Sequence, residues 1–419
     1  MSVFKTIISL GPSVMMPIIF IILALIFGVK LGKAFKSGML VGIGFVGINL
    51  VIGLLLDSLG PAAQTMVQKF GLHLTVIDAG WPVGSSIGWG SPIVPIVVFG
   101  GLIINIILLI FNLTKTVDID IFNYWHFLLT GAVIYAITNN VFIGSAGALI
   151  DFLITLFIAD RTAPKIQEAY NLKGVSFPHA TSAMYAPVGI IVNWIIERIP
   201  GLRSIDANPD KINKKFGIMG EPLTLGTILG ALLGILAGWS IPEIMNLAVK
   251  MAAVMILLPA MVNVLVQGLT IVRDAAETKL KKKFPNREFY IGMDTAILVG
   301  DPAVLATGLL LIPASIILAA VLPGNKMLPF VDLASLVYLL PMALPYCKKN
   351  VVRLFISGLV MMTLVLFAGS DIAPYFTKAA TIAQVSMPKG ITATSMASII
   401  GGATTPLGWI LIRLSMLFK

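Results

Sequence analysis

The sequence predicts an all-α polytopic membrane protein with about 10 to 12 transmembrane helices, arranged as two inverted repeats with re-entrant hairpins. Three observations lead to this fold class: an apolar composition, a repeated order of short motifs, and polar interruptions at matching places in the two copies. Hydrophobic residues make up 58% of the 419-residue chain and charged residues only 11%, against roughly 25% charged residues in soluble domains. A soluble core would not bury so much apolar surface.

Long uncharged windows supply the predicted transmembrane helices. A helix of roughly 20 apolar residues spans the hydrocarbon core of a bilayer, and many windows near this length carry no charge. Each half of the chain is interpreted as about five spans. The predicted spans are 13–29, 37–57, 91–112, 122–141, 142–159, 223–239, 247–268, 304–323, 331–347 and 351–369.

The net charge of +10 and the single cysteine exclude several classes of function. Lysines and arginines lie in the loops between the predicted spans, where they set topology and meet anionic lipid head groups, so no nucleic-acid partner is expected. Because Cys347 is the only cysteine, an internal disulfide, a cysteine-based metal cage and a two-thiol redox motif are excluded. We interpret Cys347 as a packing residue.

Short motifs recur at a spacing of about 210 to 216 residues. Five motifs return in the same order, and five ordered matches at nearly constant spacing indicate a duplication. The matches are Lys5 and Pro12 with Lys215 and Pro222, Asp78, Val83 and Gly84 with Asp294, Val299 and Gly300, Val117-Asp118 with Val331-Asp332, Phe142-Ile143 with Phe355-Ile356, and Ala180-Thr181-Ser182 with Ala393-Thr394-Ser395.

Loop charges indicate that the two copies have opposite orientations. The loop at 30–36 in the first half carries three lysines, whereas the equivalent loop at 240–246 carries no lysine or arginine and the next one, 273–287, is basic. Cytoplasmic loops are enriched in lysine and arginine, so the sign pattern predicts inversion. The same rule places the N-terminus outside and the C-terminus inside.

The repeat also predicts the division of the chain. Residues 1–175 form the first inverted repeat, and 176–219 form a re-entrant segment with a basic cytoplasmic linker. Residues 220–390 form the second inverted repeat, and 391–419 a further re-entrant segment with the last helix. Inverted repeats joined by a basic linker are typical of transporters, whose substrate site lies at the repeat interface.

Four stretches are too short, too polar or too rich in glycine and proline to be complete spans: 78–91, 176–187, 294–302 and 392–406. Irregular backbone is tolerated at membrane depth only where it is buried in protein or lines a cavity. Interrupted segments at corresponding places in two halves are therefore the best indication of a transporter's binding site.

Three ionisable side chains occur in one copy only and are the first candidate substrate ligands, because a substrate breaks the symmetry of its site. Asp301 takes the place of Ser85. His179 takes the place of Thr392, and Glu221 that of a glycine. Intramembrane ionisable residues are functional by default. Each has a competing structural interpretation: the aspartate as a helix cap, the histidine as a hydrogen-bonded group, the glutamate as a charge at a helix N-terminus.

Further candidates lie in the same segments. Asp78 and Asp294 occur in both copies, which favours a shared structural role such as capping a broken helix. Trp81 is either a stacking face for a sugar or an interfacial residue, and His126 is interpreted as part of an interfacial aromatic belt. Four hydroxyl side chains are candidate hydrogen-bonding partners of a substrate: Ser85, Ser86, Thr181 and Ser182.

These groups favour recognition of a neutral polyol over catalysis. The sequence has no phosphate-cradling Gly-Lys-Ser/Thr loop, no His-Glu-x-x-His helix and no cysteine–histidine constellation. We therefore predict no catalytic residue, no metal site and no cofactor.

The motifs GWPVGSS, FPHATSAM, GEPLTLG and LVGDPAV, in this order along the chain, resemble those of the galactitol-type IIC membrane subunits of the bacterial phosphotransferase system. The resemblance covers nearly the whole chain and extends, more distantly, to the ascorbate-type IIC subunits. It implies a homodimeric permease of the bacterial cytoplasmic (inner) membrane that carries galactitol or a related polyol by an elevator-like motion.

The resemblance also implies partners and site residues. A IIB subunit phosphorylates the delivered sugar alcohol through a phosphocysteine, which receives its phosphate from IIA, HPr and enzyme I. The histidine of the FPH break is His179 and the acid of the second-half hairpin is Asp301. His179 is followed by Ala180, where an ascorbate carrier is expected to have a polar residue, so this position argues against ascorbate. Cys347 is not the phosphocysteine, because that residue belongs to a soluble phosphate-binding loop.

Two other classes of function remain open at this point. In an ion-coupled secondary transporter, Asp301, Glu221 or Asp294 would be a proton or sodium site. An intramembrane enzyme or scaffold has weaker support, because no motif joins a nucleophile with a base.

Overall fold

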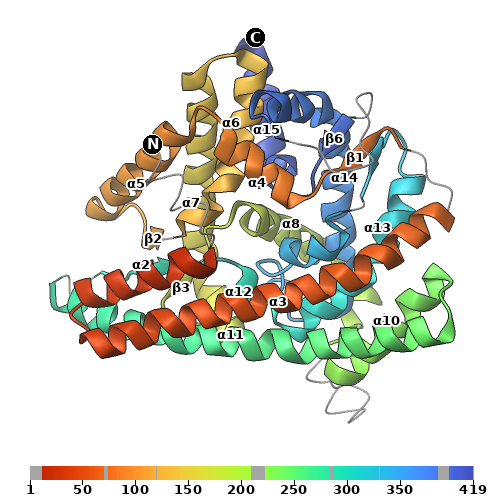
Figure 1. Cartoon of the computed structure of the whole chain (residues 1–419), viewed down its shortest axis with the longest axis horizontal. Helices are drawn as coiled ribbons and strands as arrows, with labels where there is room; N and C mark the ends of the chain where they lie inside the picture. The colour runs from red at the N-terminus through yellow and green to blue at the C-terminus, as the bar shows by residue number, and fades with distance from the viewer. Residues whose placement is uncertain are drawn as a thin grey trace.

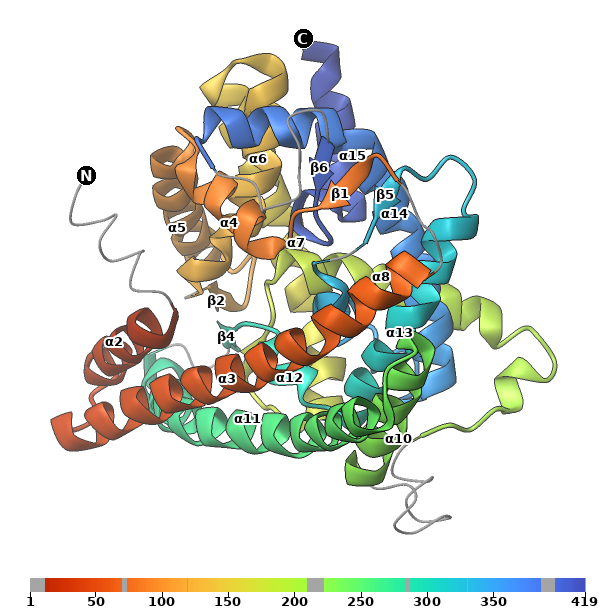
Figure 2. The same cartoon turned by 45° about the vertical axis from the view of Figure 1, so that its right-hand side comes forward.

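The computed structural model describes residues 12–69, 74–118, 120–208, 222–283, 287–329, 331–385 and 396–418. Its helices form two parts, which Figures 1 and 2 show from two sides. In the first part, two long helices lie side by side, each joined to a shorter one: α2 (Pro12–Ile26) with α3 (Leu31–Lys69), and α10 (Pro222–Ala237) with α11 (Ile241–Lys283). We call these four helices the long-helix layer.

Small residues set the close packing of α3 on α11. A Cβ atom placed on Gly44 would lie 2.5 Å from the Cβ of Leu265, and one on Gly268 would lie 2.6 Å from the carbonyl oxygen of Ser37. The Ser37 hydroxyl donates a hydrogen bond to the Gly268 carbonyl at 2.6 Å. Glycine at such contacts lets two transmembrane backbones approach closely, so only a small residue fits here.

The second part contains the remaining helices and carries all the interrupted segments described by the structure. We call it the core part. Its α-helices are α4 (Trp81–Gly90), α5 (Val94–Ile110), α6 (Trp125–Thr138), α7 (Val141–Tyr170), α8 (Ala180–Ile196), α12 (Ala296–Val299), α13 (Pro302–Val321), α14 (Val351–Ile382) and α15 (Pro406–Ser415). Short 3₁₀ helices are η1 (Ile121–Tyr124), η2 (Leu202–Ser204), η4 (Leu333–Leu339), η5 (Gly402–Thr404) and η6 (Met416–Phe418).

Two small parallel sheets join the halves of the chain. In one, β1 (Val76–Asp78) lies between β5 (Met327–Leu328) and β6 (Met396–Ser398). In the other, β4 (Tyr290–Gly292) lies between β2 (Thr116–Asp118) and β3 (Val175–Ser176). Each central strand therefore comes from one half of the sequence and both of its neighbours come from the other half.

Two of the predicted breaks each separate a short helix from a longer one. α4 and α5 are bent by 91° relative to each other across the break at 91–93, and α12 gives way to α13 at Gly300-Asp301-Pro302. The first break reads Gly90-Ser91-Pro92. The order of helices and breaks in the structure therefore aligns Asp301 with Ser91, whereas the sequence repeat aligned it with Ser85. The sequence register differs because α12 is six residues shorter than α4.

The number of complete spans is smaller than predicted. In the described part of the chain, six helices are long and apolar enough to cross a membrane, or seven if the bent pair α4 and α5 is one span. Four shorter apolar helices account for most of the difference from ten to twelve. The predicted span 331–347 is wrong: it forms η4 and a series of turns, in which Pro341 and Pro345 interrupt helical hydrogen bonding.

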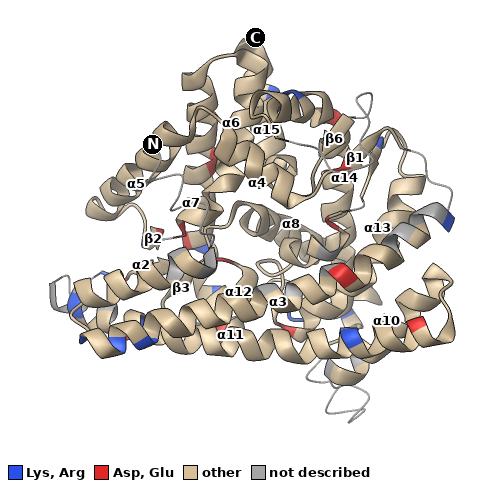
Figure 3. Ribbon diagram, viewed as in Figure 1, with Lys and Arg blue, Asp and Glu red and all other residues tan. Residues whose placement is uncertain are grey.

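The outer surface agrees with a membrane environment. Large apolar side chains point outward along the long helices, among them Ile18, Ile43 and Leu50 in the long-helix layer and Ile103 and Phe157 in the core part. Figure 3 shows long helical surfaces with few charged residues. Such faces suit contact with hydrocarbon, where an unpaired charge is costly.

Candidate functional site

His179 occupies the N-terminus of α8, directly after the third strand. Its backbone is extended, and its ring Nδ1 accepts a hydrogen bond from the Ser182 backbone N–H at 3.3 Å. Because Nδ1 is an acceptor here, the hydrogen of the neutral ring lies on Nε2. That Nε2 lies 3.9 Å from Asp294 Oδ1. The separation exceeds a direct hydrogen bond, so a hydroxyl group placed between the two atoms would bond to both.

Asp294 follows the central strand β4 and belongs to a group of buried polar side chains. Its Oδ1 accepts the Ala296 backbone N–H at 2.8 Å, which fixes the turn before α12. Asn123 interacts with Asp294 and also donates through Nδ2 to Asp120 Oδ2 at 2.7 Å. Asp118, at the end of β2, accepts the Asp120 backbone N–H at 3.2 Å. These groups offer several hydrogen-bond acceptors and one amide donor beside His179.

Aromatic rings form one side of this group. The rings of Trp125 and His126 are stacked with centroids 3.7 Å apart, and His126 lies edge-on to His179 at 4.3 Å. Trp81 lies 6.3 Å from Trp125, and Tyr338 is nearly parallel to His179 at 6.1 Å. Trp81 is 36% exposed, so its ring is not fully covered by protein. Aromatic faces of this kind suit the apolar C–H surface of a sugar or polyol.

His126 is not the interfacial belt residue that the sequence predicted, because it is only 2% exposed. Its Nδ1 lies 2.9 Å from the Asn123 carbonyl oxygen. A carbonyl oxygen only accepts, so Nδ1 carries the hydrogen and the neutral ring keeps an acceptor at Nε2. His126 and His179 thus present opposite hydrogen-bonding capacities at Nε2, which suits a hydroxyl group because it both donates and accepts.

The predicted hydroxyl residues serve mainly the protein itself. Ser182 Oγ donates to the Tyr338 carbonyl at 2.6 Å and lies 2.8 Å from Thr295 Oγ1. Thr181 Oγ1 accepts the Gly402 backbone N–H at 3.0 Å. Ser86 Oγ donates to the Pro82 carbonyl within α4. Ser85 is buried on the same short helix, at 8% exposure. Thr181 and Ser182 therefore hold the start of α8 in position.

Asp301 lies with a different set of residues. Its Oδ1 accepts the Ala303 backbone N–H at 2.8 Å, which caps α13, and its Oδ2 lies 3.9 Å from Lys349 Nζ. Tyr170 lies close enough to interact with its charge. The capping role agrees with the competing structural interpretation of this residue. Glu221, the third one-copy candidate, lies outside the residues that the structure describes.

Asp78 has the structural role that its presence in both copies indicated. Its Oδ1 accepts the Gly80 backbone N–H at 3.0 Å and its Oδ2 accepts that of Asp332 at 2.7 Å, while Asp332 Oδ1 accepts the Trp81 N–H. Asp294 makes the same turn to a backbone N–H two residues ahead. The two copies differ beyond that turn. Asp78 accepts a backbone N–H from the other half of the chain, whereas Asp294 faces the side chain of His179.

Sequence reasoning missed the polar residues of 118–126. The segment DIDIFNYWH contains two acids, an amide and a histidine immediately before an apolar run. This density of polar groups is the signal by which these residues could have been identified. The Val117-Asp118 pair was used only as a marker of the repeat. Tyr338 lies in a segment predicted as a complete span, where the sequence indicated no contact with His179.

Cys347 is buried, and its Sγ lies 3.4 Å from Ser357 Oγ. Burial raises the pKa of the Cys347 thiol to about 11, so the thiol is protonated near neutral pH. A phosphoryl acceptor needs an accessible thiolate. These properties agree with the interpretation of Cys347 as a packing residue.

The fold and the site together define a polytopic membrane permease for a small polar solute. A family model of the "PTS system sugar-specific permease component" matches residues 6–390. The galactitol-specific EIIC components of the phosphotransferase systems (PTS) of Escherichia coli strains K12 and O157:H7 are each 40% identical to the chain over 411 residues, covering 98% of this chain and 90% of each relative. A putative permease IIC component of strain K12 is 39% identical over 381 residues, covering 90% of this chain and 86% of that protein.

The chain belongs to the family of sugar-specific permease components of the phosphotransferase system. The resemblance seen in the motifs is thereby confirmed over nearly the full length. The chain is a multi-pass protein of the inner membrane, and membership of this family implies IIA and IIB partner subunits.

Proposed function

We propose that this permease binds galactitol or a closely related alditol and carries it to the cytoplasmic side for phosphorylation by its IIB partner. The observation that carries the proposal is the pair His179 and Asp294, 3.9 Å apart and buried beside Asn123 and the Trp125–His126 stack. An alditol presents a hydroxyl on every carbon, and each hydroxyl donates and accepts. The names of the two relatives at 40% identity support galactitol.

We also propose how the chain sits and moves. The exchange of strands between the halves and the side change of the basic loops support inverted repeats with the boundaries given above, an outside N-terminus and an inside C-terminus. The long-helix layer, with its outward apolar side chains, supports a scaffold that pairs in a homodimer. The core part, which carries the candidate site, would be the moving unit of an elevator.

The function is tested with the protein reconstituted in sealed vesicles together with IIA, IIB, HPr and enzyme I. Galactitol uptake is followed with and without phosphoenolpyruvate, and the product is analysed as free or phosphorylated sugar. We expect phosphorylated product that requires phosphoenolpyruvate and persists when ion gradients are collapsed. Free sugar that accumulates only with an ion gradient would favour the ion-coupled alternative and overturn the proposal.

The topology and the dimer have separate tests. A cysteine introduced at Asn325 should react with an impermeant maleimide from outside intact cells, whereas one at Lys348 should react only after permeabilisation. Mass measurement in lipid nanodiscs should give two chains per particle. Equal labelling of the two sites from outside, or one chain per particle, would contradict these proposals.

A further inference from the structure

The segment 333–349 connects the candidate site with the protein surface at Lys349. Within η4, Tyr338 lies parallel to the His179 ring and accepts the Ser182 hydroxyl through its carbonyl. The chain then passes through turns, where the Pro341 carbonyl accepts the Tyr170 hydroxyl at 2.7 Å, and reaches Lys349 eleven residues after Tyr338. The chain segment that contacts His179 through Tyr338 therefore leads to the surface at Lys349.

Positive charge gathers at this surface on three elements. The C-terminal half of α7 carries Arg161 and Lys165, the end of α8 carries Arg198, and the turn before α14 carries Lys348 and Lys349. We call these five residues the basic rim. Lys165 lies over the Tyr346 ring at 4.8 Å, which joins the first and third elements, and Lys348 Nζ lies 2.7 Å from Glu197 Oε1, which joins the third to the second.

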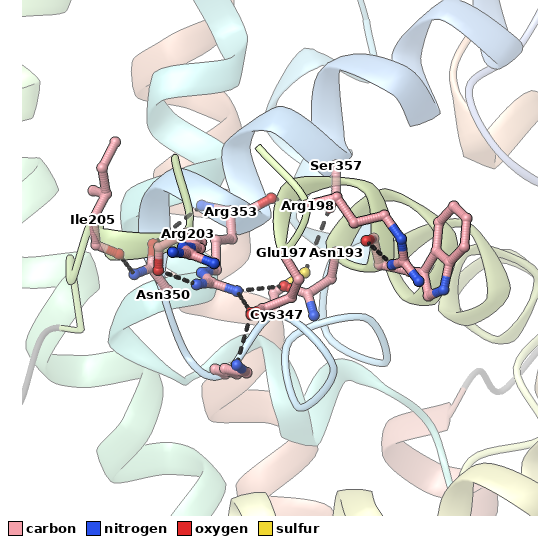
Figure 4. A network of polar contacts seen from close by, with 11 residues as sticks. Asn193, Glu197, Arg198, Arg203, Ile205, Cys347, Asn350, Arg353 and Ser357 are labelled. Carbon is pink, nitrogen blue, oxygen red and sulfur yellow. Dashed lines mark hydrogen bonds and ion pairs between the residues drawn. The ribbon is translucent and has the colours of Figure 1, made fainter. Parts of the chain in front are cut away.

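The turn at Lys348 and Lys349 is held in an uncommon backbone conformation. Both residues have positive φ, 56° and 53°, a region that side chains other than glycine occupy at a cost and that persists only where the surroundings fix it. Arg353 holds Glu197, the acid that pairs with Lys348 in this turn. It is 4% exposed and donates to Glu197, to Asn193 Oδ1 at 2.8 Å and to the Arg203 carbonyl at 2.7 Å (Figure 4).

The acids near the basic rim do not cancel its charge. Glu197 is shared by Lys348 and the buried Arg353, and Asp301 caps α13 beside Lys349. Glu168 is exposed on the last turns of α7. Lys165 and Arg198 contact aromatic rings and are exposed residues. A cation packed on an aromatic ring keeps its charge while its position is fixed, which is how a docking surface presents charge to a partner.

We propose that the basic rim is the docking surface for an acidic protein partner that carries a phosphoryl group, the phosphorylated IIB subunit. The proposal rests on the function proposed above, and it identifies which of the basic surfaces the partner uses. A phosphoryl donor is anionic and must reach the bound polyol, so it needs a positive surface that is continuous with the site. The 333–349 segment provides that continuity.

The test uses the full-length protein in nanodiscs of neutral phosphatidylcholine, with phosphorylated IIB as the probe. In the double variant Lys165→Glu/Arg198→Glu, we expect the KM for IIB in sugar phosphorylation to rise by about tenfold or more and the salt dependence of IIB association to weaken. Galactitol affinity, measured without IIB, should stay within about twofold, because neither side chain contacts the site. The milder pair Lys165→Gln/Arg198→Gln should give a smaller rise, which keeps the test valid if the first variant fails to fold.

Two matched controls carry the same charge change at other basic surfaces. Lys30→Glu/Lys33→Glu alters the start of α3, and Lys279→Glu/Lys281→Glu alters the basic end of α11. Both should leave the KM for IIB within about twofold. An unchanged KM in the rim variant, or an equal rise in a control, would overturn the proposal. A rim that instead holds anionic lipid would show an unchanged KM and less co-purifying phosphatidylglycerol. If the wild type yields no phosphorylated sugar at all, the proposed function itself has failed.

Discussion

Asp294 has two roles: it accepts the hydrogen bond that forms the turn before α12, and it presents a negative charge towards His179. Replacing it with asparagine keeps the first role and removes the second. The asparagine keeps an oxygen that accepts the Ala296 backbone N–H at 2.8 Å, so the turn before α12 is preserved. It loses the negative charge that faces His179 Nε2 at 3.9 Å. The change therefore leaves the fold intact and weakens the hydrogen bonds that a polyol hydroxyl would make there.

The expected magnitude follows from the exchange of a charged acceptor for a neutral one. A hydrogen bond to a charged group contributes about 1.5–3 kcal/mol and one to a neutral group about 0.5–1.5 kcal/mol, so the difference of about 1–1.5 kcal/mol corresponds to a Kd for galactitol roughly 5- to 13-fold higher in Asp294→Asn. Isothermal titration calorimetry of the protein in detergent, without IIB, measures this Kd directly. The melting temperature of the unliganded protein should change little.

Asp78→Asn is the matched control, because Asp78 makes the same turn in the other copy. Its second oxygen accepts the Asp332 backbone N–H at 2.7 Å, and an amide NH₂ at that place would set donor against donor. We expect a lower melting temperature with nearly unchanged galactitol affinity. Asp294→Asn with a Kd within twofold of the wild type would refute the assignment of Asp294 to the site.

Four further changes have defined outcomes. His179→Ala should abolish measurable galactitol binding. Asp301→Asn should bind galactitol nearly normally, because its amide oxygen can still cap α13. Loss of binding in Asp301→Asn alone would show that Asp301, and not His179, is the substrate ligand. Thr130→Val removes the 2.8 Å hydrogen bond to the buried Asp151 between α6 and α7 and should destabilise the protein by about 1 kcal/mol in a steric-trapping or thermal assay. Two cationic partners lower the pKa of Glu197 to about 2; the stabilisation is present above its unfolded pKa and lost as the pH falls through the folded one, so Glu197→Gln should lower the melting temperature at pH 5 to 8 and match the wild type progressively below about pH 4.

The membrane class and the places of the broken segments were predictable because both depend on local composition. The His179 break was found from FPH followed by small polar residues, and the structure places His179 at the start of α8. The complete span predicted at 331–347 failed although its two prolines, Pro341 and Pro345, argue against a helix there. Mean hydropathy outweighed them because the segment is apolar for a different reason: it is buried inside the core part.

The membership of the site was less predictable because it depends on contacts between distant segments. His126 meets His179 across 53 positions, and Asn123 meets Asp294 across 171 positions. A polar residue near a span start has the same local pattern whether it faces lipid head groups or the interior, so His126 was assigned to the interface. Symmetry breaking was applied to residue identity, whereas the copies also differ in the surroundings of a shared residue: Asp294 is present in both copies as Asp78, and only the neighbours of the two aspartates differ.

The exchange of strands between the halves has a consequence for how the chain is made. Val76 of β1 pairs with Met396, which is synthesised 320 residues later. At roughly 5–20 residues per second, the first central strand waits on the order of 16 to 64 seconds for its last neighbour. The β2–β4–β3 sheet is complete once residue 292 has emerged, so the two sheets close at different times. A nascent chain that ends before β6 therefore has one sheet complete and the other with an open edge at β1. This open edge is a structural difference by which quality control in the membrane could distinguish an unfinished chain from the finished permease.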